Sequence, residues 1–298
     1  MKKKNGFIAI SLIYSFFLCF IMIMMGLLAN YTHSKLILSK INKPLTYLSD
    51  NTLSGQILKD NEVKTSPNFS ANHTDKGLYV QKGDNTKSID GKPTYYFRGN
   101  VTNNYVTFAG MTWRIVRINE DGTIRLISAL EYDGGAYSGS ANGSYESSSI
   151  KTKIDNWYNN LSTANQSLIA TGVFCNDTTL TASSRLSSSP TFVCPTNAKT
   201  LNLKAGIISA DELRYSGSAI NANGNTFINN GWTWTMTMAS STRMYYIRDA
   251  GVWNDADGTI TSRYRNYRYI INLNSDVTVT SGDGTSSNPY LIENVNNQ

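Results

Sequence analysis

Residues 104–128 have the sequence NYVTFAGMTWRIVRINEDGTIRLIS, in which apolar and polar side chains alternate as they do in half-buried β-strands. Alternation turns five large side chains inward, and these are Val106, Phe108, Trp113, Ile115 and Ile118. Asp121-Gly122 suits a tight hairpin turn, because both residues tolerate a positive φ. The return strand carries Ile124, Leu126 and Ile127. The stretch therefore predicts a two-stranded hairpin with a buried face and a solvated face, the latter including Arg114, Arg117 and Arg125.

The chain around this hairpin has the composition of a strand-and-turn protein. It is rich in Asn, Ser, Thr, Gly and Tyr and poor in Leu, Glu and Lys. Short helices are predicted after Ser148 or Ser149, over residues 163–169, and after Ser209. The first of them carries Ile150, Ile154, Trp157 and Leu161 on one face. The segments WTWTM, MYYIRDAGVWN and YRYIINLN then return to strand. We predict an α+β domain over residues 89–298, mostly antiparallel sheet with two or three short helices.

Two of the three cysteines flank a Ser- and Thr-rich stretch of this domain. We predict a disulfide between Cys175 and Cys194, which would close a loop of about 20 residues and stabilise the fold by about 3 kcal/mol. Such bridges persist in oxidising compartments. The alternative is a pair of unrelated buried thiols. A zinc site is disfavoured, because the two histidines lie far from this pair in sequence.

The N-terminus has the pattern of a membrane helix. Residues 7–29, FIAISLIYSFFLCFIMIMMGLLA, contain no charge, and as a helix they are long enough to cross a hydrocarbon core of about 30 Å. The run exceeds the apolar part of a cleaved signal peptide and lacks a small-x-small exit. Lys2, Lys3 and Lys4 favour a cytoplasmic N-terminus. A single-pass protein of the cell membrane with an extracellular body is therefore expected, in agreement with the disulfide.

The way this segment begins resembles a type IV prepilin. A Lys-rich leader ends in Gly6, and Phe7 starts the apolar helix. In that family a prepilin peptidase cleaves after the glycine, and the first helix continues outward as an amphipathic rod, as residues 31–48 do here. The family usually has Glu at the fifth mature position, where this chain has Ser11. Two alternatives stay open: a minor pilin-like subunit with pilin subunits and the peptidase as partners, or a plain signal anchor.

These patterns divide the chain into four parts. Residues 1–6 form a basic leader, 7–48 a transmembrane and pilin-like helix, 49–88 a polar linker or stalk, and 89–298 the extracellular domain. Residues 61–298 carry 20 Lys and Arg against 19 Asp and Glu. This near-neutral balance disfavours nucleic acid as a partner.

Several motifs over residues 76–293 resemble a family of uncharacterised surface proteins of low-GC Gram-positive bacteria. They include YYFRGN, DNWYNN, FCND, PTFVC, GIISADEL and INLNSDVTVTSGDGTSSNPYLI. The closing region of the family is similar to the C-type-lectin-like fold of formylglycine-generating enzymes, so this fold is implied here. The family cysteines that correspond to Cys175 and Cys194 recur, which implies the same bridge. Relatives usually have Val-Arg-Pro where this chain has Tyr267-Arg268-Tyr269, so a different local turn is expected.

The residue types that catalysis needs are scarce in the predicted domain. His33 and His73 both lie outside it, so no Ser-His-Asp or Cys-His set is expected. The adjacent carboxylate pairs Glu131 with Asp133 and Asp211 with Glu212 rarely converge on one sugar, which makes a carbohydrate-active enzyme a remote alternative. No cysteine follows Cys194 for formylglycine chemistry. Residues 255–258, DADG, fail as a calcium loop and suit a hairpin turn. We predict no catalytic residue, no metal and no cofactor.

One cluster of aromatic and basic residues in the last third suits ligand binding. Aromatic rings stack on sugars and guanidinium groups hold carboxylates or sulfates, so a surface built from both could bind acidic glycans or a protein. The candidate residues are Trp232, Trp234, Tyr245, Trp253, Arg263, Tyr264, Arg265, Tyr267 and Arg268. The alternative is that the rings fill the core while the arginines cover the exposed rings.

The sequence thus predicts a membrane-anchored or minor-pilin-like bacterial surface protein with an extracellular adhesion or ligand-binding domain. The alternative is a purely structural, pseudopilin-like subunit of a fibre or secretion apparatus.

Overall fold

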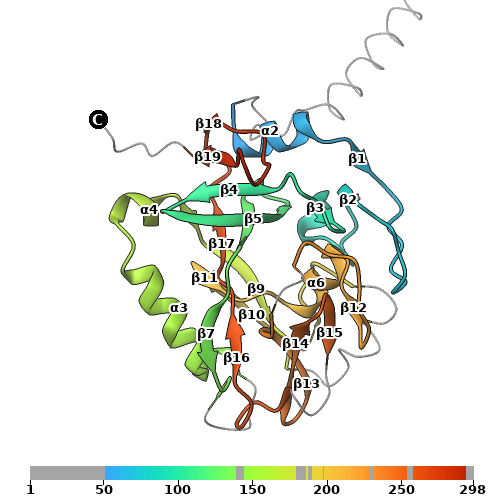
Figure 1. Ribbon diagram of the computed structural model, residues 1–298, viewed down its shortest axis with the longest axis vertical. Coiled ribbons are helices and arrows are strands. Elements are labelled where there is room, and N and C mark those ends of the chain that lie inside the picture. Colours follow the sequence, from blue (N-terminus) through green and yellow to red (C-terminus); the bar gives the residue numbers. More distant parts are fainter. Residues whose placement is uncertain are drawn as a thin grey trace, which may run out of the picture. The chain divides into compact units, whose positions relative to one another are not determined.

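The computed structural model describes residues 51–138, 144–178, 186, 190–196, 198–228, 231–253 and 258–292 (Figure 1). The predicted leader, the cleavage site at Gly6 and Phe7, and the apolar segment of residues 7–29 lie outside these ranges. Inside them, no helix has the length and hydropathy needed to cross a membrane. All described residues belong to one compact unit, Tyr47–Gln298.

The larger of the two main sheets is built around the predicted hairpin. Strand β5 (Met111–Ile118) pairs antiparallel with β6 (Ile124–Ser128), with Ile118 opposite Ile124. Gly122 in the turn has a φ of +85°, which glycine adopts without strain. The five side chains expected to face inward, from Val106 to Ile118, are at most 2% exposed. The hairpin and its buried face are confirmed.

This sheet extends to both sides of the hairpin. The order on one path is β1, β2, β3, β5, β4, β19 and β18, and β6 continues through β17 to β11 and β8. The additional strands are β1 (Val63–Lys64), β2 (Gly77–Gln81), β3 (Thr94–Arg98), β4 (Tyr105–Phe108), β8 (Ile169–Ala170), β11 (Ala205–Gly206), β17 (Ile270–Leu273), β18 (Val279–Ser281) and β19 (Tyr290–Ile292).

The second sheet carries most of the predicted ligand residues. Its order is β12 (Ala219–Ile220), β15 (Gly251–Trp253), β14 (Arg243–Arg248), β13 (Thr233–Ser240), β16 (Arg265–Tyr267) and β7 (Tyr132–Gly135). A separate antiparallel pair consists of β9 (Gly172–Asn176) and β10 (Lys199–Leu203). In Figure 1 the second sheet occupies the lower part of the body and the hairpin the upper part.

The helices are short and begin where capping residues predict. Helix α3 (Ser149–Asn159) begins after Ser148, whose side chain accepts a hydrogen bond from the Lys151 N–H. Helix α6 (Ala210–Ser216) begins with a capping box, in which Ser209 and Glu212 each accept from the other's backbone N–H. The others are α2 (Leu53–Asp60) and α4 (Thr163–Ser167), with single 3-10 turns at Ile89–Gly91 and Tyr145–Ser147. A mostly β, α+β fold with few short helices is confirmed.

Residues 51–88 are part of the folded body, and the prediction of a linker over residues 49–88 is wrong for them. Leu53 and Ile57 of α2 are fully buried. The backbone N–H of Leu53 donates to the Val277 carbonyl, and β2 pairs along its length with β3. The segment contains few apolar side chains, so its composition resembles that of a linker. Those few are enough to hold it in the fold, because residues far along the chain supply the other side of each contact.

The arginines of the central hairpin are buried, although the sequence predicted a solvated face for them. Arg114, Arg117 and Arg125 are 9%, 4% and 2% exposed. Arg117 lies over the Phe192 ring and Arg125 over the Phe174 ring, so segments from the disulfide region cover this face of the sheet. The sheet is therefore packed on both faces. On the face that carries the arginines, the packing contacts are those of guanidinium groups with aromatic rings.

The predicted disulfide is present between Cys175 and Cys194, whose Cα atoms lie 5.2 Å apart. It joins the end of β9 to the segment of residues 190–196, which also contributes Phe192.

Removing this bridge tests its contribution to stability. Because the two cysteines are 19 positions apart in sequence, loss of the bridge in a Cys175→Ala, Cys194→Ala variant is expected to lower the free energy of unfolding by about 3 kcal/mol. Urea unfolding measures the difference. Cys19→Ala is the matched control, because Cys19 lies outside the unit Tyr47–Gln298. An unchanged urea midpoint for the double variant would show that the bridge does not stabilise the fold.

Candidate functional site

The second sheet brings aromatic and arginine side chains of three strands together. Trp234 of β13 lies opposite Tyr246 of β14, and Tyr246 lies opposite Trp253 of β15. Strand β16 runs parallel to β13, with Thr233 opposite Asn266. Cross-strand neighbours are about 5 Å apart, close enough for large rings to touch. The hydrogen-bonding register thus places residues distant in sequence on one patch.

On this patch, guanidinium groups and rings alternate. Arg248 lies 4.0 Å from the ring centre of Trp253 and 5.3 Å from that of Trp232. Arg265 lies 4.4 Å from the ring centre of Trp232 and 5.1 Å from that of Tyr246. We call Trp253, Arg248, Trp232, Arg265 and Tyr246 the aromatic–arginine ladder. Each such contact contributes about 0.5–2 kcal/mol, depending on how dry it is.

Further contacts fix the ladder in place. The indole N–H of Trp253 donates to the Arg248 carbonyl over 2.8 Å, and Arg248 Nη1 donates to the Tyr246 hydroxyl over 3.4 Å. Trp232 and Tyr246 stack with ring centres 6.0 Å apart. The rings cover the flat faces of the guanidinium groups. The N–H groups at the edges of each guanidinium are therefore the parts suited to hydrogen bonding with a ligand.

The structure separates the nine predicted ligand residues by exposure. Tyr264 is 75% exposed, Trp232 is 39% exposed, and Arg263 is exposed. Trp253 and Arg265 are half-buried. The remaining four are at most 6% exposed and pack inside the body: Trp234, Tyr245, Tyr267 and Arg268. The alternative in which the rings fill the core therefore holds for Trp234, Tyr245 and Tyr267, whereas ligand binding by the exposed and half-buried residues stays a prediction.

Two ladder residues were outside the predicted site set. Arg248 and Tyr246 share a face of β14 because they are two positions apart. Alternation in MYYIR could have assigned this pair. It could not have placed Arg265 beside them, because that contact depends on the parallel pairing of β16 with β13.

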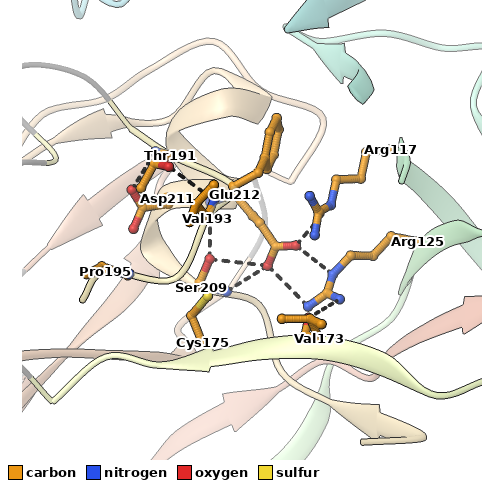
Figure 2. A pocket seen from close by; sticks show the side chains of 11 residues that line it. Arg117, Arg125, Val173, Cys175, Thr191, Val193, Pro195, Ser209, Asp211 and Glu212 are labelled. Atoms are coloured by element: carbon orange, nitrogen blue, oxygen red, sulfur yellow. Dashed lines mark hydrogen bonds and ion pairs between the residues drawn. The ribbon is translucent and has the colours of Figure 1, made fainter. Parts of the chain in front are cut away.

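A second group of charged residues is buried beside the disulfide (Figure 2). Glu212 Oε1 lies 2.5 Å from Arg125 Nε and 3.5 Å from Arg117 Nε, and Figure 2 shows both arginines pointing toward this carboxylate. The backbone N–H and the hydroxyl of Ser209 donate to Oε2 over 3.1 and 3.2 Å. Burial alone would raise the pKa of Glu212, but the two arginines and Ser209 outweigh burial and lower it.

This buried group has the features of a structural ion network. The pocket beside it has a volume of only about 10 Å³, room for about one water molecule. Burial lowers the pKa of Arg125 to about 10, against the opposing effect of Glu212. The carboxylate therefore holds the two guanidinium groups in the core and leaves no room for a ligand beyond the size of water.

His73 lies inside the body, and the expectation that both histidines lie outside the folded domain is wrong for it. Its ring is 5% exposed, with Nε2 2.8 Å from the Gly217 carbonyl oxygen. The N–H of Asp75 donates to Nδ1 over 3.2 Å. Burial lowers the pKa of His73 below its ordinary value of 6.5. The Nε2 contact thus joins His73 to the end of helix α6, and the Nδ1 contact is local to residues 73–75.

The carboxylates considered for glycoside cleavage have other partners. Glu131 accepts from the Thr233 hydroxyl and the Asn266 amide, each over 2.8 Å, and Asp211 accepts from the Thr191 N–H over 2.9 Å. Within the described ranges, no group of three or more His, Cys, Asp or Glu side chains is placed to hold a metal ion. The predicted turn at residues 255–258 lies mostly outside those ranges.

No family model matches the chain, and no curated protein or solved structure is significantly similar to it. The resemblance to a Gram-positive surface-protein family therefore stays a prediction from the motifs.

Replacing Glu212 tests the buried ion network. Glu212→Gln keeps the size of the side chain but leaves two buried arginines without a negative partner, so the free energy of unfolding at pH 7 should fall by about 3–5 kcal/mol. Because the folded-state pKa of Glu212 is lowered from 4.5, its contribution is complete above pH 4.5 and is lost as the pH falls through the lowered value. The difference from wild type should therefore shrink in acid.

Urea unfolding at several pH values measures this difference. Glu146→Gln is the matched control, because Glu146 pairs with Lys199 on the surface and should change stability by less than about 1 kcal/mol. A Glu212→Gln protein as stable as the wild type at pH 7 would contradict the assignment.

Proposed function

We propose that this chain is a bacterial surface protein whose body binds a ligand outside the cell. The uncharged residues 7–29 support attachment to a membrane, and the Cys175–Cys194 disulfide supports an oxidising environment for the body. The basic residues at positions 2–4 support the orientation in which the body is extracellular.

The proposed ligand is an acidic glycan, and the aromatic–arginine ladder is the observation that carries this proposal. Trp232 is 39% exposed, and the guanidinium groups of Arg248 and Arg265 lie 5.3 and 4.4 Å from its ring centre. The exposed part of this indole offers apolar contact to a sugar ring, and guanidinium edges offer paired N–H groups to a carboxylate or sulfate. Tyr264 and Arg263, both exposed beside Arg265 in sequence, add a second ring and a further charge.

The mostly β fold is compatible with the C-type-lectin-like architecture that the motifs imply, and that finer assignment is part of the proposal. The attachment has two forms. Gly6 followed by Phe7 supports a processed, pilin-like subunit in a fibre, whereas Ser11 in place of the usual glutamate supports a plain signal anchor. In either form the body would carry the recognition function.

Glycan binding can be measured with the full-length chain, purified in a mild detergent, on an array of acidic and neutral glycans. We expect binding to glycans with uronic or sialic acids, weakened at least about tenfold by Trp232→Ala and by the double change Arg263→Ala, Arg265→Ala. Arg243→Ala is the matched control, because it removes the same charge at the other end of β14 from Arg248. Binding that survives both ladder variants would restrict the ladder to a structural role.

The attachment can be tested separately. We expect the full-length chain to sediment with membranes and a chain that begins at Tyr47 to stay in the supernatant, because the truncation removes the apolar segment. N-terminal sequencing of the membrane-extracted protein then distinguishes the two forms: a start at Phe7 indicates peptidase processing, and an intact leader indicates a simple anchor. A full-length chain found in the soluble fraction would contradict both.

A further inference from the structure

A cavity of about 210 Å³ lies beside the central hairpin, and none of the residues that line it belongs to the aromatic–arginine ladder. Its walls come from the loop after β3, from β4, β5 and β6, from residues 227–228, and from the residue after β16. Two arginines, Arg114 and Arg268, line it, and none of its lining residues is an aspartate or glutamate. The remaining walls are Asn100, Val101, Thr102, Tyr105, Ile127, Ala129, Phe227 and Ile228.

Arg114 is held rigidly at this cavity and has no acidic partner among the described residues. Its guanidinium lies 3.9 Å from the ring centre of Tyr105 and 5.0 Å from that of Phe227. It donates from Nε to Asn104 Oδ1 over 2.6 Å, from Nη1 to the Tyr105 hydroxyl over 3.0 Å, and from Nη2 to the Val101 carbonyl over 2.8 Å. A guanidinium has five N–H groups, so one on each terminal nitrogen remains beyond these three bonds.

Arg268 contributes the second positive charge. Its Nη1 donates to the carbonyls of Ser128 and Ala129, and its Nη2 lies 3.4 Å from Glu131 Oε1. Glu131 also accepts from Thr233 and Asn266, which are neutral donors, so Arg268 is its ionic partner in this group. The contact with Arg268 is the longest of these, and Glu131 is not part of the cavity wall.

The two arginines oppose each other electrostatically. Burial lowers the pKa of Arg114 to about 10, and the charge of Arg268 acts in the same direction. Glu131 lies beside Arg268, whereas Arg114 has no carboxylate partner among the described residues, so the buried charge of Arg114 is costly unless an anion lies near it. An anion bound here would remove that cost, whereas a neutral ligand would not.

We propose that this cavity binds a small carboxylate, with its oxygens on the Arg114 guanidinium and within reach of Arg268. The two rings fix the plane of Arg114, and a planar carboxylate can accept two parallel N–H bonds in that plane. The volume lies below the range of about 300–1,000 Å³ that is usual for drug-sized ligands, so the carboxylate belongs to a small acid of about the size of one sugar unit. Exposed Asn100 and Thr102 at the rim suit the hydroxyl groups of such an acid.

The test is calorimetric titration of the full-length chain at constant ionic strength with glucuronate, and with glucose as its uncharged counterpart. We expect glucuronate to bind the Trp232→Ala protein, whose ladder is altered, with one site per chain and to raise its melting temperature, and glucose to do neither. Acetate binding as tightly as glucuronate would support a site that recognises the carboxylate alone.

Variants connect the binding to the cavity. Arg114→Gln should weaken glucuronate binding at least about tenfold. Because Arg114 also supports its own loop, Thr102→Trp is a second variant that places a large ring at the exposed rim and leaves both arginines intact, and it should weaken binding similarly with unchanged urea unfolding. Trp232→Ala is the control, because the ladder is a separate site, and it should leave glucuronate binding unchanged. Equal binding of glucose and glucuronate, no binding of glucuronate, or full binding by the Thr102→Trp protein would each overturn the proposal.

Discussion

The fold depends on a single buried carboxylate. Glu212 begins helix α6 through its capping box and at the same time neutralises Arg125 and Arg117, which come from both strands of the central hairpin. Those guanidinium groups lie over Phe174 and Phe192, next to the two ends of the disulfide. This carboxylate thus links helix α6, the central hairpin and the segments at the two ends of the disulfide. Their packing depends on it, because it neutralises the two arginines that are buried between them.

The central hairpin could be predicted because its pattern is local: alternation assigns Trp113 and Ile115 to the core, and Asp121-Gly122 specifies the turn. The burial of its arginines could not. A strand covered on both faces normally has a nearly continuous apolar sequence, and here charge pairing with Glu212 replaces apolar contact on the second face. Residues 51–88 were mistaken for a linker for a related reason, since α2 and β2 derive their stability from partners more than a dozen positions away.

The candidate site could also be predicted only in part from the sequence. Sequence composition identified the cluster of rings and arginines, but its separation into exposed and buried members depends on strand pairing. Register shifts between Trp234 and Met238, and again before Ser240, interrupt simple alternation along β13. The cavity at Arg114 and Arg268 could not be predicted because its walls come from five separate stretches of the chain, at residues 100–105, 114, 127–129, 227–228 and 268. Arg268 was selected from the sequence as a surface residue, and the structure places it in that wall.

The described chain enters and leaves the body at one end. The Leu53 N–H donates to the Val277 carbonyl, the Val279 N–H donates to the Asn51 carbonyl, and α2, β18 and β19 lie together at the top of Figure 1. The Tyr290 hydroxyl also donates to Asp60. A pulling force applied at residue 51 would therefore pass first into β18 and β19 and only afterwards into the rest of the large sheet. The ladder lies on the other main sheet, so these outer strands would bear the load before the ladder does.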